Sequence, residues 1–293
     1  MSGLIGQLNY QIRTADTLKR LIGINVLVFV VIRLTNAVSM LFLHPLLGFS
    51  AVSEWLAVPA SVERLLYHPW TAITYMFVHW DFMHLLFNML WLYWFGGILK
   101  EFLGAPKLLS TYLLGGLAGA FVYLTAYNTL PLFDGSAATS FAIGASASTM
   151  AITIAAATLL PDYSIPLLFF GPVRLKWIAL ITLLLDLINV SGNNAGGHIA
   201  HLGGAVFGFS YIVALRKGYD LSGWLQKLLF PSTSGRKSAI PKRPRGPSDE
   251  DFVRKRNQQQ DRLDELLDKI SKSGYESLTD EEKDFLFRAS KNR

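Results

Sequence analysis

The sequence predicts an all-α, polytopic membrane protein built as a bundle of six membrane-spanning helices, with both termini in the cytoplasm. Its charges are distributed unevenly: residues 1–215 contain 9 of the 27 Lys and Arg residues and 8 of the 21 Asp and Glu residues. A soluble domain of that length needs more charged surface, whereas a domain embedded in lipid does not. The same region contains six apolar runs, and the segments that connect them alternate in basic content.

Each apolar run has at least the ~17 residues that a membrane-spanning helix needs. The predicted spans are residues 21–43, 72–99, 108–127, 142–160, 174–190 and 197–215. Basic residues precede the first span, but no small-residue cleavage site follows it. We therefore expect a retained helix and not a signal peptide.

The connecting segments predict the orientation. Segment 44–71 contains a single Arg, and segments 128–141 and 191–196 contain no Lys or Arg. The connection between the second and third spans and both flanks carry at least two basic residues each, and Arg174 and Lys176 follow the turn at Pro161 and Asp162 between the fourth and fifth spans. Because basic segments stay on the cytoplasmic side, both termini are expected there.

The chain is expected to divide into a cytoplasmic N-terminal segment (1–20), the six-helix domain (21–215), a juxtamembrane segment with a basic linker (216–248) and a small cytoplasmic helical tail (249–293). In the tail, the spacing of Leu263, Leu266, Leu267 and Ile270 predicts a helix. Thr279 followed by Glu282 predicts a capping box at the start of a second helix. The basic tail favours contact with an anionic membrane surface over nucleic acid, and its partner, if any, is left open.

Polar residues inside a membrane are costly and are therefore candidates for function. Three predicted helices run inward from the outer side, and each reaches a charged residue at the cytoplasmic edge. The separations are 16 residues from His84 to Lys100, 16 from Ser146 to Asp162 and 15 from His201 to Arg216. At ~1.5 Å per residue, all three polar residues lie roughly 22–24 Å above the inner edge, a little below the outer surface.

These residue types suit acyl transfer. A serine hydroxyl becomes a nucleophile when a neighbouring imidazole takes its proton, and the tetrahedral intermediate needs hydrogen-bond donors. Ser146 near a helix start offers free backbone N–H groups, and His84 with Asn88, one turn below it, can add side-chain donors. The chain has no Cys, which excludes thiolate catalysis, and no His-Glu-x-x-His sequence, so neither a metal nor another cofactor is expected.

Three short motifs resemble those of the rhomboid family of intramembrane serine proteases. HWDFMHLLFN (79–88) is similar to the family's H-x4-H-x3-N, GASAS (144–148) to its G-x-S-G, and AHLGG (200–204) to its A-H-x-x-G. Glu101 and Gly104 also match an Glu-x-x-Gly element between the second and third spans. The resemblance covers roughly residues 20–215, and the motifs fall in the expected helices and order.

The resemblance implies Ser146 as nucleophile and His201 as general base, with no third member. It also implies that His84, Asn88 and the Ser146 backbone N–H stabilise the oxyanion. The sequence departs from the family pattern at Ala147, where glycine is usual, at Met150, where an aromatic ring is usual, and in an outer loop without a Trp-Arg pair.

Four other polar residues leave alternatives open. Ser148 competes with Ser146, but we expect it to be a packing hydroxyl. His198 competes with His201, which is favoured by its spacing to Gly204. Asp186 is expected to be an interfacial residue, with orientation of His201 as the alternative. Arg33 in the first span is expected to face the bundle interior or a polar cavity.

The predicted function is hydrolysis of peptide bonds in or near transmembrane segments, through an acyl-enzyme on Ser146. The expected partners are the lipid bilayer and a membrane-protein substrate with a transmembrane helix. The expected location is a bacterial cytoplasmic membrane, with the active site open to the extracytoplasmic side. The alternative is a catalytically weak or inactive rhomboid-like protein that binds transmembrane helices.

Overall fold

A computed structural model of the chain describes residues 16–42, 55–167, 171–192, 194–229, 262, 265–274 and 277–291. The chain forms two compact units, Met1–Ser232 and Thr233–Arg293. Most of the predicted N-terminal segment, most of the basic linker and Leu263 lie outside the described residues.

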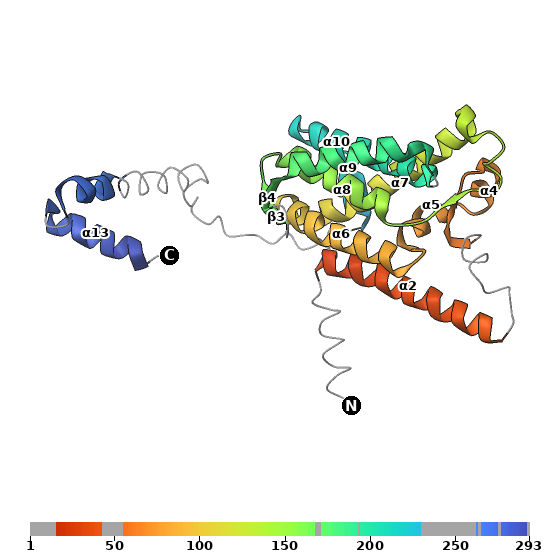
Figure 1. Cartoon of the computed structure of the whole chain (residues 1–293), viewed down its shortest axis with the longest axis horizontal. Helices are drawn as coiled ribbons and strands as arrows, with labels where there is room; N and C mark the ends of the chain where they lie inside the picture. Colours follow the sequence, from red (N-terminus) through yellow and green to blue (C-terminus); the bar gives the residue numbers. More distant parts are fainter. Residues whose placement is uncertain are drawn as a thin grey trace, which may run out of the picture. The chain divides into compact units, whose positions relative to one another are not determined.

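The first unit is a bundle of helices (Figure 1), which confirms the predicted helical class. The long elements are α2 (Thr17–Leu41), α6 (Phe82–Leu103), α7 (Ala105–Thr129), α8 (Ser146–Leu159), α9 (Leu175–Ile188) and α10 (Ala195–Arg216). Shorter helices are α4 (Val62–Tyr67), α5 (Thr71–Thr74), α11 (Gly223–Leu229) and the 3₁₀ turns η2 (Tyr75–Phe77), η3 (Pro131–Phe133) and η4 (Asn189–Ser191). Helix α8 packs against α6, α7, α9 and α10 and so forms the centre of the bundle.

Four helices in the described part of the chain are long and apolar enough to cross a membrane: α2, α6, α7 and α10. Helices α8 and α9 have 14 residues each, about 21 Å at a rise of 1.5 Å per residue. The fourth predicted span, 142–160, begins too early, because α8 starts only at Ser146. Residues before Ser146 are apolar but not helical, because the chain turns at Gly144 with a φ of +121°.

The second predicted span, 72–99, also begins too early. Residues in its first part form α5 and η2, and α6 begins only at Phe82. Asp81 caps this helix, since its Oδ1 accepts a hydrogen bond from the His84 backbone N–H at 2.9 Å. The cap places His84 in the first turn of α6, close to one end of the bundle.

Two small sheets complete the first unit. Strand β1 (Val58–Pro59) pairs antiparallel with β2 (Phe141–Ala142), and β3 (Ser164–Leu167) pairs antiparallel with β4 (Gly171–Arg174). The Gly144 N–H also donates to the Tyr75 carbonyl at 2.9 Å. The segment that leads into α8 is thus anchored to the chain that precedes α6.

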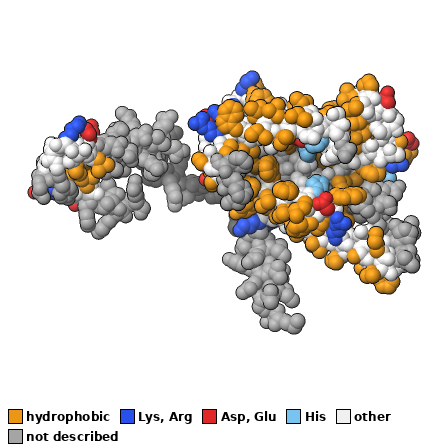
Figure 2. All heavy atoms as spheres, viewed as in Figure 1, with side chains coloured by type: hydrophobic (Ala, Val, Ile, Leu, Met, Phe, Trp, Pro, Cys, Tyr) orange, Lys and Arg blue, Asp and Glu red, His pale blue; other side chains and the backbone are white. Residues whose placement is uncertain are grey.

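The outer faces of the helices are strongly apolar. Figure 2 shows hydrophobic side chains covering most of the visible surface of the first unit, with few charges among them. Large apolar side chains such as Leu34 on α2, Phe87 on α6 and Leu187 on α9 are each about 60% exposed. A surface of this kind is favourable in lipid and costly in water.

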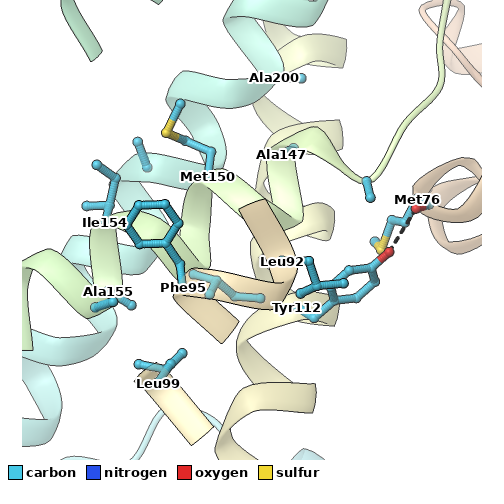
Figure 3. Close-up of a cluster of buried hydrophobic side chains, with 14 of the residues drawn as sticks. Met76, Leu92, Phe95, Leu99, Tyr112, Ala147, Met150, Ile154, Ala155 and Ala200 are labelled. Atoms are coloured by element: carbon cyan, nitrogen blue, oxygen red, sulfur yellow. Dashed lines mark hydrogen bonds between the residues drawn. The ribbon is translucent and has the colours of Figure 1, made fainter. Parts of the chain in front are cut away.

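The interior combines large side chains with close contacts between small ones. Figure 3 shows Phe95 of α6 beside Met150 and Ile154 of α8, and Leu92 of α6 beside Tyr112 of α7. On the other side of α8, a Cβ atom at Gly204 would overlap the backbone oxygen of Ala147. Gly204 therefore allows α10 to approach α8 closely, because there is no space for a side chain at this position.

Gly115 of α7 provides a test of this packing. A Cβ at Gly115 would overlap the Cβ of Ala151 on α8, while its next neighbour, Phe207, is at 3.7 Å. We expect Gly115→Ala to lower the free energy of unfolding by about 1–3 kcal/mol, and the double variant Gly115→Ala/Ala151→Gly to recover most of the loss. Thermal unfolding in detergent, with Ala151→Gly alone as control, measures this. A single Gly115→Ala variant as stable as the parent would contradict the close approach of α7 and α8.

The second unit is a small helical structure. Residues 265–273 are helical, and α13 spans Asp280–Lys291. The predicted capping box is confirmed: the Thr279 N–H donates to Glu282 Oε2 at 2.7 Å, and the Glu282 N–H donates to Thr279 Oγ1 at 3.3 Å. The Lys269 ammonium lies 2.8 Å from the same Glu282 carboxylate and links the two helical segments.

Candidate active site

Ser146 is the first residue of α8. The first backbone N–H groups of a helix have no intrahelical partner, and the residue before Ser146, Ala145, has no side chain that could cap those of α8. These groups lie beside the Ser146 hydroxyl. The local sequence thus places a hydroxyl and unpaired donors at one point of the bundle.

Two cavities have both Ser146 and His201 in their walls. The first has a volume of about 740 Å³ and is also lined by His84. The second has a volume of about 270 Å³ and is also lined by Asn88. The structure therefore brings together the four residues that the sequence selected from α6, α8 and α10.

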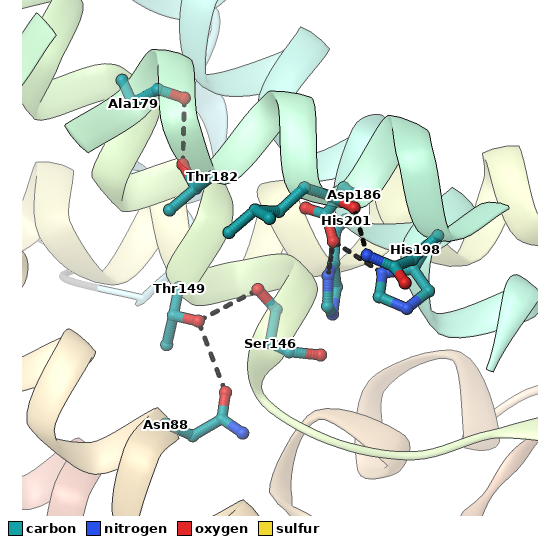
Figure 4. A network of polar contacts seen from close by, with 10 residues as sticks. Asn88, Ser146, Thr149, Ala179, Thr182, Asp186, His198 and His201 are labelled. Atoms are coloured by element: carbon teal, nitrogen blue, oxygen red, sulfur yellow. Dashed lines mark hydrogen bonds and ion pairs between the residues drawn. The ribbon is translucent and has the colours of Figure 1, made fainter. Parts of the chain in front are cut away.

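His201 is held by a carboxylate on a different helix. Its Nδ1 lies 2.8 Å from Oδ1 of Asp186 on α9, and Nδ1 of His198 lies 2.8 Å from the same oxygen. Figure 4 shows the ring of His201 extending from Asp186 towards Ser146. Asp186 is only 6% exposed, so the expectation of an interfacial residue was wrong.

The Ser146 hydroxyl and His201 are not directly bonded in the part of the chain that the structure describes. The Ser146 backbone carbonyl accepts a hydrogen bond from the Thr149 hydroxyl at 2.9 Å. Catalytic hydrogen bonds are often long without substrate and tighten when it binds. Both side chains line the same two cavities.

His84 and Asn88 lie where they can donate hydrogen bonds. A Cβ built at Gly144 would be 2.8 Å from His84 Nε2 and 3.5 Å from Ser146 Oγ, so both atoms border one small space. The Trp80 N–H donates to His84 Nδ1 at 3.4 Å, which favours the neutral ring with its proton on Nε2. Asn88 Nδ2 donates one of its two protons to the His84 carbonyl at 2.8 Å, and its Oδ1 lies 3.4 Å from the Thr149 hydroxyl of α8.

His79 supports the loop before Ser146. It is 1% exposed, its Nε2 accepts from the Ala145 N–H at 3.4 Å, and its ring meets that of His84 edge-on at 5.0 Å. The contact of His79 with the loop before Ser146 was not predictable from the sequence, because it depends on the path of the chain between η2 and α6.

The competing serine, Ser148, does not line the cavities that Ser146 borders. Ser148 is fully buried, and a Cβ at Gly116 on α7 would be 2.6 Å from its hydroxyl, so it packs between α7 and α8. Ala147 carries a methyl group where glycine is usual in the family pattern. That methyl occupies space left by Gly119, where a Cβ would meet it at 2.5 Å.

Arg33 differs from the expectation of an inward-facing residue. Its side chain is exposed, donates to the Trp80 carbonyl and lies over the Phe29 ring at 5.4 Å. The expectation was wrong because the guanidinium finds a backbone acceptor at the edge of the bundle and needs no interior partner.

Asp186, His198 and His201 are also a possible metal-ligand set, with ligand atoms within 4.8 Å of one another. Two imidazoles and one carboxylate are common ligands of transition metals. The arrangement is accounted for without an ion, because both Nδ1–H groups can donate to one carboxylate oxygen.

Comparison with known proteins agrees with the motifs. A family model described as the rhomboid domain matches residues 67–218, and a model described as a family of unknown function (DUF6576) matches residues 248–292. RHOMBOID-like protein 12, mitochondrial, from Arabidopsis thaliana is 31% identical over 157 residues, 50% of this chain and 47% of that protein.

Rhomboid protease GlpG from Klebsiella pneumoniae (strain 342) is 33% identical over 85 residues, 29% of this chain and 30% of that protein. The GlpG of Salmonella newport is 35% identical over 77 residues, 26% of this chain and 28% of that protein. The chain thus spans about half or less of the length of these curated relatives. The rhomboid domain match covers more than half of this chain and includes all four candidate site residues, and the chain belongs to the rhomboid family.

Proposed function

We propose that the protein is an intramembrane serine protease that hydrolyses peptide bonds in or near transmembrane segments of other proteins. The observation that carries the proposal is that the Ser146 hydroxyl and the His201 ring line the same cavities, with donors from His84 and Asn88 beside them. Two of the relatives bear the name rhomboid protease, which supports the same chemistry.

The proposed reaction begins when Ser146 Oγ attacks the scissile carbonyl and His201 Nε2 takes the hydroxyl proton. The Nε2–H of His84, the amide of Asn88 and the Ser146 N–H donate to the oxyanion. The intermediate collapses, the C–N bond breaks, and His201 returns the proton to the leaving amine. A water molecule, deprotonated by His201, then hydrolyses the ester and restores Ser146. No metal or other cofactor is needed.

We further propose that the bundle lies in the bacterial cytoplasmic membrane, with α8 and α9 as the fourth and fifth of six membrane-inserted helices and both termini in the cytoplasm. The asymmetry of basic residues supports this orientation. Ser146 would then lie below the extracytoplasmic surface, because α8 is only about 21 Å long. Residues 1–20 and 216–293 would be cytoplasmic, the latter as juxtamembrane segment, linker and helical tail.

The substrate would be a membrane protein with a transmembrane helix, reaching the site from the lipid. A helix hides its carbonyl groups in hydrogen bonds, so helix-breaking residues in the substrate should expose the scissile bond. Gly or Pro within the cleaved segment is therefore expected to increase the rate of cleavage.

The test uses the full-length protein reconstituted in liposomes with a single-span substrate that has Gly and Pro within its span. We expect two products whose masses sum to that of the substrate plus one water, and loss of cleavage after pretreatment with a serine-reactive fluorophosphonate. Vesicles without the protein are the control. Absence of products, together with intact substrate that co-purifies with the protein, would favour the alternative of an inactive rhomboid-like protein that binds transmembrane helices. This alternative is retained because the structure, which describes both residues, shows no hydrogen bond between Ser146 and His201.

A further inference from the structure

We propose that Asp186 is a positioning residue for His201, so that the site operates as Ser146–His201–Asp186 and not as a two-residue site. This inference rests on the proposed function. It extends that function by assigning a role to Asp186 on α9, which acts on the base, His201, and does not contact the substrate.

The contact with Asp186 decides which nitrogen of His201 can act as a base. Asp186 Oδ1 can only accept a hydrogen bond from Nδ1 at 2.8 Å when Nδ1 carries the proton. The second nitrogen, Nε2, then has a free lone pair, and the ring extends from Asp186 towards Ser146 (Figure 4). A base must have this lone pair on the side of the hydroxyl. The carboxylate also stabilises the imidazolium that forms when the proton is taken.

The burial of Asp186 indicates a role beyond solubility. A carboxylate with 6% of its surface exposed is costly unless it is paired. Its Oδ2 is buried and has no hydrogen-bond partner among the described residues, while its Oδ1 serves both histidines. An apolar residue on α9 would avoid the cost of burying this group. The presence of a charged carboxylate at this buried position is explained if its electric field acts on His201 during catalysis.

His198 shares the carboxylate but differs in position. It contacts the same Asp186 oxygen, yet it is not among the residues that line either cavity with Ser146. Its bond therefore fixes Asp186 from the side away from the nucleophile. Asp186, held from two directions by α10, holds the ring of His201 in one orientation.

The first test compares kcat and KM for a membrane-embedded substrate in the parent, Asp186→Asn and Asp186→Glu. The amide of Asn can donate to Nδ1 and so favours a proton on Nε2, which removes the base. We expect kcat to fall by about 10²–10⁴-fold in Asp186→Asn, with KM within a factor of about three and an unchanged unfolding midpoint. Asp186→Glu keeps a carboxylate and is expected to recover activity to within roughly tenfold of the parent.

A second measurement does not depend on cleavage. ¹⁵N-histidine NMR is expected to show His201 protonated on Nδ1 in the parent and on Nε2 in Asp186→Asn. A parent ring protonated on Nε2 would overturn the positioning role whatever the activity. An unchanged kcat in Asp186→Asn would also overturn the positioning role. If the parent is active, the proposed protease function would still stand. Loss of activity with a lowered unfolding midpoint and no rescue by Glu would show that Asp186 serves only the fold.

Discussion

Replacement of Ser146 by alanine is expected to abolish covalent labelling by a fluorophosphonate probe and to lower the rate of substrate cleavage by a factor on the order of 10⁴ to 10⁶. The probe reacts only with a serine whose proton is taken by a base. Ser146 and His201 line both cavities, His84 lines the larger one and Asn88 the smaller one. Without its oxygen, no acyl-enzyme can form, and only residual stabilisation by the donors remains. Fluorescence of the labelled band in a gel measures the first effect.

Ser148→Ala is the matched control for this experiment. Its hydroxyl is fully buried between α7 and α8 and has no hydrogen-bond partner among the described residues. Removing it should leave labelling within about twofold of the parent, because the hydroxyl has no partner that its loss would leave unsatisfied. Labelling that persists in Ser146→Ala and disappears in Ser148→Ala would show that the nucleophile has been misassigned.

His201→Gln is expected to have the second largest effect, a loss of kcat on the order of 10³ to 10⁶. Glutamine has a similar size and keeps a polar contact with Asp186, but it cannot take a proton at neutral pH. The oxyanion donors from His84 and Asn88 remain, so substrate binding should change little. Cleavage rates with the reconstituted substrate, and the rate of probe labelling, measure the effect.

His198→Gln is the control for His201, since both rings bond to the same Asp186 oxygen at 2.8 Å. We expect a loss of at most about tenfold, because His198 acts only through the carboxylate. A loss of 10³ or more in His198→Gln, with an active His201→Gln, would identify His198 as the base.

The sequence predicted the helices well where apolar length alone decides them. It placed α7 and α10 within three residues at each end, and counting from the cytoplasmic edge identified Ser146, His84 and His201 as neighbours. The length of an apolar stretch predicts the wrong helix boundary where part of that stretch is not helical. The starts of α6 and α8 depend on the Asp81 cap and on the positive φ of Gly144, which hydropathy does not detect.

The part of the site that the sequence missed is Asp186. Nearly all positions of α9 are apolar, so the pattern does not reveal which face of the helix turns inward. The cost of an acidic residue in lipid predicted that it needs a partner. His198 and His201 lie at that end of α10 and can donate to a carboxylate, so weighing that cost more heavily would have found the contact.

The 14-residue length of α9 has a consequence for the surrounding lipid, because α9 has an exposed apolar face whereas α8, of the same length, lies at the centre of the bundle. Beside α9, the apolar thickness of the protein is several ångströms smaller than that of an ordinary bilayer, whereas α2 and α7 have 25 residues each. Such hydrophobic mismatch is relieved by local thinning of the bilayer or by tilting of the longer helices. The acyl chains next to α9 would then be compressed, and membranes of shorter lipids would fit this side of the protein better than thick ones.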